Sequence, residues 1–403
     1  MKTLLRLTAS TALTLSMGAV AFGQHYVQTN LQSSVSGVAE ETAPDLVNAW
    51  GITRTSASVW WVNSEKEGKA LLFNGPGTRQ SSPVSQVFVP PAVKNQQTPI
   101  GSPTGIVSNN SATDFLLAPG KPAVFIFATL DGTIAGWNPK FNAAPGEAPP
   151  STHAFTVVKN TDGSIYRALT IGFINGKRFL YAANFGTGKV DVFDNAFHAV
   201  DVSKLQGSPT DDQAAIDVQT APFTDSQLPA GFVPFGIQAI GDDIAVSYAL
   251  HQEGQKAETD GPGNGYVDLF DTTGHILTRF EHVDNLNTPW GMVLAPLDFG
   301  RFSHDLLVGQ FAGAGDTEHS GEILAFDLAT GKFKGALEDA SGKTLVINGI
   351  WGLSPANVAP ATVDPDDEPA AQIYFTAGPN KSTQGLFGYL TAVSTELVEG
   401  SVQ

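Results

Sequence analysis

The sequence predicts an all-β fold, a six-bladed β-propeller built from four-stranded blades. One strand signature recurs six times along the 403 residues. Turn-forming residues are abundant, with 42 glycines and 25 prolines, while 42% of the residues are apolar, so the chain can bury a large core of short strands. A four-stranded sheet cannot cover both of its own faces, and six such units therefore stack on one another in a ring.

The recurring signature is a glycine, four residues, and an aromatic residue followed by Asn or Asp. Each copy follows an apolar run, so the two together predict a β-hairpin that closes in turns made by the Asn or Asp. Ahead of each hairpin another strand begins, usually with an aromatic residue and a glycine, as in W-G-I at Trp50. The copies span residues 68–74, 132–138, 188–194, 265–271 and 321–327, and a degenerate sixth copy spans 384–390.

The segment 25–35 has the pattern of a strand and stands before the first repeat, while little chain follows the last repeat. We expect this N-terminal strand to complete the sixth blade as its outer strand. The ring would then be closed without an exposed sheet edge in that blade.

Residues 1–23 have the layout of a secretory signal peptide. Lys2 and Arg6 precede a Leu- and Ala-rich run that ends in small residues, and we expect cleavage after Gly23. Residues 24–403 are then expected to form a single propeller domain, secreted or periplasmic. No later segment approaches the roughly 18 apolar residues of a membrane-spanning helix, so no membrane span is expected after signal removal.

The charge balance limits the class of partner. The formal net charge of −17 argues against binding to nucleic acid or to anionic membranes, because both attract basic surfaces. The expected partner is a small molecule, a glycan or a protein, and we expect a monomer. The chain has no cysteine, so its fold must be stabilised by packing without disulfide bonds.

Ligand sites in propellers usually lie where many loops converge at one end of the central channel. The repeat register assigns a set of polar and aromatic residues to this end, which we call the mouth. Arg167 differs from the other blade starts because it replaces the aromatic residue there, which predicts either a cation near the channel or a structural salt bridge. The repeated aromatic residues predict either a stacking platform for rings or wedges between blades. The candidate ligand-binding residues are Asn63, Glu65, Asp131, Arg167, Asn184, Trp290, Gln310, Asn348 and Trp351.

Two long loops, 249–264 and 311–320, belong to adjacent blades and reach the same end of the channel. They carry His251, Asp260, Asp316 and His319, which together could hold a divalent metal ion. Mixed imidazole and carboxylate ligands suit Zn, Mn, Fe or Cu better than Ca²⁺. No close ligand spacing such as H-E-x-x-H supports this site, and solvated polar loops are the alternative.

Several segments resemble a family of uncharacterised secreted bacterial six-bladed propellers of the NHL-like type. They include F-A-T-L-D-G-T-I-A-G-W-N at 127–138, P-F-G-I-Q-A-I-G at 234–241 and G-P-G-N-G-Y-V-D-L-F-D at 261–271. The resemblance implies the propeller fold and export from the cytoplasm. Members often carry C-terminal sorting tails, which we do not find in this sequence. The family has no established activity that could be carried over.

Two classes of function remain open. The first is a binding propeller that holds a ligand or partner at the mouth, and the second is a metal-assisted hydrolase or lactonase-like enzyme. Nucleophilic catalysis has no support, because the sequence has neither a cysteine nor a G-x-S-x-G motif. Convergence of the four candidate metal ligands would favour the enzyme.

Overall fold

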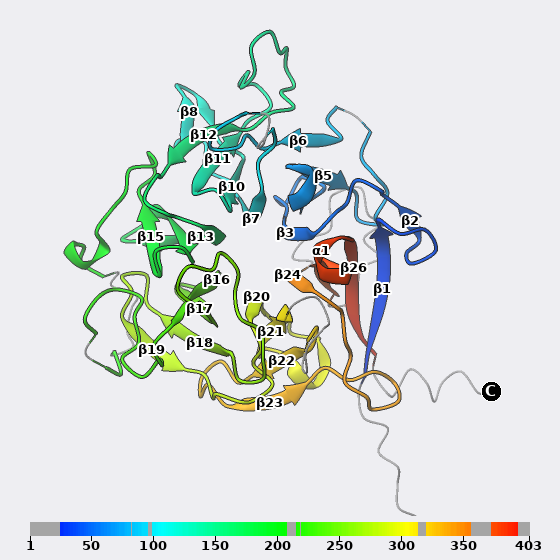
Figure 1. Cartoon of the computed structure of the whole chain (residues 1–403), viewed down its shortest axis with the longest axis vertical. Coiled ribbons are helices and arrows are strands. Elements are labelled where there is room, and N and C mark those ends of the chain that lie inside the picture. Colours follow the sequence, from blue (N-terminus) through cyan, green and yellow to red (C-terminus); the bar gives the residue numbers. More distant parts are fainter. Residues whose placement is uncertain are drawn as a thin grey trace, which may run out of the picture.

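The structure, a computed structural model, describes residues 25–81, 83–95, 99–207, 215–217, 219–312, 320–355 and 372–393. Six small antiparallel sheets are arranged radially around a common centre (Figure 1). The predicted six-bladed β-propeller is confirmed. The signal peptide predicted at 1–23 lies outside the described residues.

Each blade runs from an inner strand at the centre to an outer strand at the rim. The first blade contains β3 (Ala49–Thr53), β4 (Trp60–Ser64), β5 (Lys69–Phe73) and β6 (Gln86–Phe88), and the second contains β7 (Pro103–Ser108), β10 (Phe125–Thr129), β11 (Thr133–Trp137) and β12 (Phe155–Lys159). The fourth contains β16 (Phe232–Ile240), β17 (Asp243–Leu250), β18 (Gly265–Phe270) and β19 (Ile276–Arg279), and the fifth contains β20 (Pro289–Leu294), β21 (Leu306–Gln310), β22 (Ile323–Phe326) and β23 (Phe333–Ala336).

The third blade departs from the four-strand expectation. Among the described residues it contains β13 (Tyr166–Ile174), β14 (Lys177–Asn184) and β15 (Lys189–Phe193). The chain after β15 makes one isolated bridge, between Phe193 and Ala199, and then enters a 3-10 turn at Val202–Lys204. Small additional elements are the hairpin of β8 (Leu116–Ala118) and β9 (Lys121–Pro122), two further 3-10 turns at Glu65–Glu67 and Gly300–Phe302, and the short α1 (Pro379–Ser382).

The sixth blade joins the two ends of the chain, as predicted. It contains β24 (Ile350–Pro355), β25 (Gln372–Ala377), β26 (Leu386–Val393) and then β1 (His25–Ser33), with the two-residue β2 (Glu41–Thr42) beside β1. β1 pairs antiparallel with β26, from His25 opposite Val393 to Ser33 opposite Leu386. Figure 1 shows β1 alongside β26 at the rim of this blade.

β1 also contacts the fifth blade. The backbone N–H of Tyr26 donates to the carbonyl of Glu338 (2.9 Å), and its hydroxyl donates to the carbonyl of Phe299 (3.2 Å). The Tyr26 ring packs on Phe299 and Phe302, with centroids 4.9 and 6.0 Å apart. One strand therefore closes the sixth blade and attaches it to its neighbour.

Adjacent blades are held together by large side chains that alternate along the strands. Successive residues of a strand point to opposite faces, so Trp60 and Trp61 of β4 contact different neighbours. Trp60 packs on Tyr374 of the sixth blade (centroids 4.4 Å apart), while Trp61 stacks on Phe125 of the second (4.0 Å). The core therefore lies between the blades.

The glycine at the start of most inner strands sets how closely the blades approach. Each inner strand contacts the next around the whole ring. A Cβ atom at Gly236 or Gly291 would lie 2.2 Å from the carbonyl oxygen of the next inner strand, at Trp290 and Trp351 respectively. Only a residue without a side chain allows this approach, which explains the repeated glycine of the sequence pattern.

Candidate functional site

Most of the residues predicted to line the mouth are buried. The hairpin residue Asn63 donates to the carbonyl of Thr104 in the next blade (2.8 Å). The side-chain oxygen of Gln310 accepts the backbone N–H of Asn287 (2.9 Å). Both side chains are fully buried, so their polar groups already serve to join the hairpins to neighbouring strands.

Asn184 belongs to a buried polar network in the third blade. Its oxygen accepts the backbone N–H of Ile165 (3.0 Å) and its amide nitrogen donates to Asp191 (2.8 Å). Asp191 also accepts the hydroxyl of Tyr166 (2.7 Å). Burial, and then the adjacent Asp191 carboxylate, raise the pKa of Tyr166 above its usual range, so the phenol stays a hydrogen-bond donor.

Three further candidates differ in exposure. Glu65 is buried and accepts the side-chain N–H of Asn48 (3.0 Å). Asp131 is half-buried and accepts the backbone N–H of Ala92 and the hydroxyl of Thr129. Asn348 is exposed. Ligand binding by these residues stays a prediction.

The aromatic residues of the mouth pack together and fill the channel at this end. Trp351 stacks between Trp50 and Phe311, with ring centroids 3.7 and 3.6 Å away. The indole N–H of Trp290, from the fifth blade, reaches the carbonyl of Arg167 in the third (3.3 Å). These rings are buried, which fits the interpretation that they wedge between blades, and the described part of the chain presents no open stacking platform at these rings.

Arg167 lies within this aromatic cluster. Its guanidinium carbon is 4.8 Å from the ring centroid of Phe185, 5.3 Å from Phe235 and 5.6 Å from Trp50. It also forms a salt bridge to Glu258 (2.9 Å) and donates to the carbonyl of Lys256 (2.7 Å), both from the long loop 249–264. Arg167 is therefore both a buried cation near the channel and a partner in a structural salt bridge, which were the two alternatives for this residue.

The candidate metal ligands are only partly described. The Nε2 atom of His251 lies 2.7 Å from the carbonyl of Gln255, and its ring packs on Phe185 (4.5 Å). Asp260 accepts the hydroxyl of Thr288 (2.8 Å). Asp316 and His319 lie outside the described residues, and within the described part no group of three or more His, Asp or Glu side chains is arranged to hold a metal ion.

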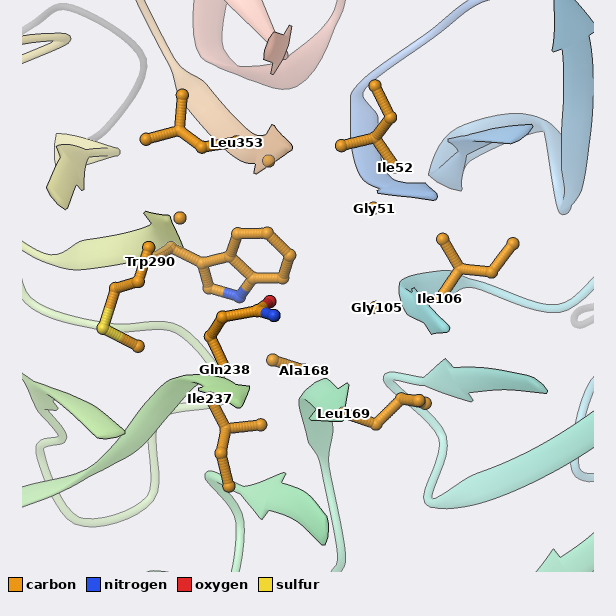
Figure 2. A pocket seen from close by; sticks show the side chains of 13 residues that line it. Gly51, Ile52, Gly105, Ile106, Ala168, Leu169, Ile237, Gln238, Trp290 and Leu353 are labelled. Carbon is orange, nitrogen blue, oxygen red and sulfur yellow. The ribbon is translucent and has the colours of Figure 1, made fainter. Parts of the chain in front are cut away.

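The channel is open at the opposite end. A cavity of about 450 Å³ is lined by the far ends of the inner strands and by the loop after β20, which contributes Pro296 and Leu297. It continues into a smaller chamber of about 40 Å³, where Figure 2 shows the Trp290 indole and the Gln238 amide pointing toward the centre. One side chain from each inner strand lines both spaces: Ile52, Ile106, Leu169, Gln238, Met292 and Leu353.

Sequence reasoning missed this cavity, although the pattern contains a signal for it. The fourth residue of each inner-strand motif lines the larger space, and four of the six are polar: Thr53, Thr170, Gln238 and Ser354, beside Val107 and Val293. A polar residue recurring after a Gly-aliphatic pair marks the layer of the channel that holds hydrogen-bonding groups.

The lining of this cavity can form hydrogen bonds. Among the described residues it contains no Asp, Glu, Lys or Arg, and His304 is the one titratable side chain in that described lining. Each inner strand pairs on one edge alone among the described strands, so backbone groups of the other edge face the channel. The amide of Gln238 makes one bond within the described chain, a 3.3 Å contact to the carbonyl of Ala239. The arrangement can hold an uncharged molecule that has both polar groups and apolar surface.

No protein-family model matches the chain. An uncharacterised protein of Acanthamoeba polyphaga mimivirus is 28% identical over 369 residues, covering 89% of this chain and 84% of the relative. Among solved structures, virginiamycin B lyase from Staphylococcus aureus is 12% identical with a TM-score of 0.44, covering 92% of this chain and 100% of that one. A gluconolactonase from Xanthomonas campestris is 12% identical with a TM-score of 0.34, covering 67% and 82%.

The propeller assignment therefore rests on the sheet order of this chain itself. Membership of a secreted bacterial family stays a prediction. In the described part of the chain, no helix has the length and apolar character needed to cross a membrane.

Proposed function

We propose that this protein is an exported binding protein that holds an uncharged small molecule in its central channel. The observation that carries the proposal is the cavity of about 450 Å³, whose described lining contains no Asp, Glu, Lys or Arg. Its size falls in the usual range for small-molecule sites, roughly 300–1,000 Å³. The described lining offers an ion no Asp, Glu, Lys or Arg as a partner, and burying an unpaired charge is costly, which favours a neutral ligand.

The lining narrows the ligand class further. Hydroxyl and amide groups of Thr53, Thr170, Gln238 and Ser354 form one layer, and a ring of mostly aliphatic side chains lies beneath it. A molecule with hydroxyl or carbonyl groups on one side and C–H surface on the other matches both layers. A sugar ring or another polyhydroxylated ring has this character.

Export is the second part of the proposal. The closing strand β1 begins at His25, so cleavage after Gly23 would remove the leader and leave every residue of that strand. The binding site would then function outside the cytoplasm. Mass determination of the N-terminus of the protein recovered from its native host tests this, and a retained leader would refute it.

The binding proposal is tested with matched neutral and charged rings. Methyl glucoside, glucosamine and glucuronate are compared by ligand-observed NMR against the wild type and two variants, Thr53→Trp and Ser56→Trp. The first substitution fills the cavity and the second adds the same side chain three residues away, at an exposed position outside the lining. We expect the neutral ring to bind and Thr53→Trp to abolish binding. Equal binding of charged rings, no binding of the neutral ring, or binding that survives in Thr53→Trp would refute the proposal.

Gln238 provides the test of polar recognition. Gln238→Leu keeps the approximate size of the side chain and removes its amide, and Gln252→Leu is the control because Gln252 is exposed on the loop at the other end. We expect ligand affinity to fall about tenfold in the first variant, equivalent to about 1.4 kcal/mol, and to stay unchanged in the second.

A further inference from the structure

We propose that Arg167 forms a second binding site, specific for a carboxylate-bearing ligand, and that the chain's own Glu258 occupies this site in the present state. The site lies at the filled end of the channel, opposite the neutral cavity. It is therefore independent of the function proposed above.

The surroundings of Arg167 have the features of a carboxylate receptor. Three aromatic rings surround the guanidinium, from Phe185, Phe235 and Trp50, at 4.8 to 5.6 Å. The Arg167 side chain is 6% exposed and that of Glu258 is 9% exposed, so the charges meet in an environment of low polarity. A rigid arginine fork between aromatic faces binds carboxylates with two parallel hydrogen bonds.

Glu258 contacts one guanidinium nitrogen and leaves other donors around the site without a partner among the described residues. One of its oxygens, Oε2, lies 2.9 Å from one guanidinium nitrogen, Nη2. The Nε atom of Arg167 and the indole N–H of Trp50 are both buried without an acceptor among the described residues. A buried donor without a partner costs about 1–3 kcal/mol. A free carboxylate that engages Nε and Nη2 together would satisfy the fork better than the tethered Glu258 does.

The segment that carries Glu258 is bridged at its base and exposed along most of its length. We call residues 251–259 the strap. The strap closes on itself through a bridge between His251 and Glu258 and a bond from the N–H of Thr259 to the carbonyl of Leu250 (2.8 Å). Its residues 252–257 are exposed. Among the described residues, displacement would break the contacts of Glu258, His251 and the Lys256 carbonyl with the cluster. It would also affect the bonds of the His251 N–H to Gly231 and of Asn264 to the Thr259 carbonyl.

A ligand must compete with a tethered carboxylate whose effective concentration is in the mM range. Removing Glu258 should therefore raise the affinity for an external carboxylate by about tenfold or more. Propionate is the probe because it reproduces the end of a glutamate side chain. Its binding is read from tryptophan fluorescence, since Trp50, Trp290 and Trp351 belong to the cluster.

The test compares Glu258→Ala with Glu253→Ala, which removes an exposed carboxylate from the same strap. We expect Glu258→Ala to bind propionate at least about tenfold more tightly than the wild type, with chloride at equal ionic strength having no effect. Adding Arg167→Lys, which keeps the charge and loses the fork, should remove the gain. Equal affinity in Glu258→Ala and the wild type, or a gain that survives Arg167→Lys, would overturn the proposal.

A second measurement uses the unaltered protein and does not depend on any variant's stability. Lys256 lies in the exposed part of the strap, where trypsin can cut after it. Propionate should accelerate this cleavage in the wild type by releasing the strap, while equimolar chloride should not. A cleavage rate that propionate leaves unchanged would show that the strap is a fixed part of the fold and would overturn the displacement.

Discussion

Replacing Gly291 with alanine tests the spacing of the whole ring. The added Cβ would lie 2.2 Å from the carbonyl oxygen of Trp351, whereas ordinary van der Waals contact begins at 3.4 Å. The fifth and sixth inner strands would have to separate by more than 1 Å, and the obstacle is backbone, which cannot rotate away. Overpacking of this kind costs about 1–3 kcal/mol, and we expect the upper end of that range.

The assay is thermal unfolding followed by circular dichroism. A loss of about 3 kcal/mol should lower the melting temperature by about 4 °C in a protein of this size. Gly75→Ala is the control, because no atom lies within 4 Å of its Cβ position and its φ is ordinary. The control should keep or slightly raise the melting temperature. If Gly291→Ala has the same melting temperature as Gly75→Ala, close approach of the blades does not explain the repeated glycine.

Three further predictions concern closure, pH and blade contacts. Deleting residues 25–33 should expose the edge of β26 and produce aggregation, which size-exclusion chromatography would detect; a stable monomer would contradict the closure argument. Burial raises the pKa of Glu147, but hydrogen bonds from Thr152, His153 and Ser151 outweigh it and lower the pKa to about 2. Because that pKa is depressed, the Glu147 carboxylate stabilises the fold at neutral pH, and Glu147→Gln should lower the unfolding free energy by roughly 1 kcal/mol at pH 7. The difference in stability between the wild type and this variant should disappear as pH falls from about 4.5 to 2, and a difference that does not depend on pH would refute this. Asn63→Ala should cost about 1–3 kcal/mol in urea unfolding by leaving the buried carbonyl of Thr104 without its donor, and an unchanged midpoint would argue against this contact.

The fold was predictable because each blade repeats the same local constraints. Three local features each predict β-strands at the same places in the sequence. They are the glycine before a hairpin, the aromatic residue at the end of the hairpin, and the alternation of apolar residues. The closing strand β1 followed from the need to cover an edge. The outer strand of the third blade was less predictable, because an outer strand has a single neighbour to fix its position. There the chain after Phe193 turns back at Ala199 instead of extending.

The sequence could suggest which residues lie near the channel, but it could not predict how deeply their side chains are buried. The register predicted a mouth position for Asn63, Gln310 and Trp351, and the structure shows that each of them makes buried hydrogen bonds there. It could not show that Trp290 crosses from the fifth blade to the Arg167 carbonyl, because that contact depends on the width of the ring. Whether a side chain is buried at the centre depends on all six blades together, and no single repeat contains this information.

The pairing of β1 with β26 has a consequence for biosynthesis. Ser33 and Leu386 are neighbours in the sheet although nearly the whole chain separates them, so the loop that joins them must be closed before their pairing stabilises anything. During synthesis the first five blades can form while β1, which is made first, still lacks β24, β25 and β26. Until those strands emerge, Tyr26 can hold β1 beside the fifth blade through the contacts of its aromatic ring with Phe299 and Phe302. The ring of a nascent chain therefore stays open until β26 has been made and can pair with β1.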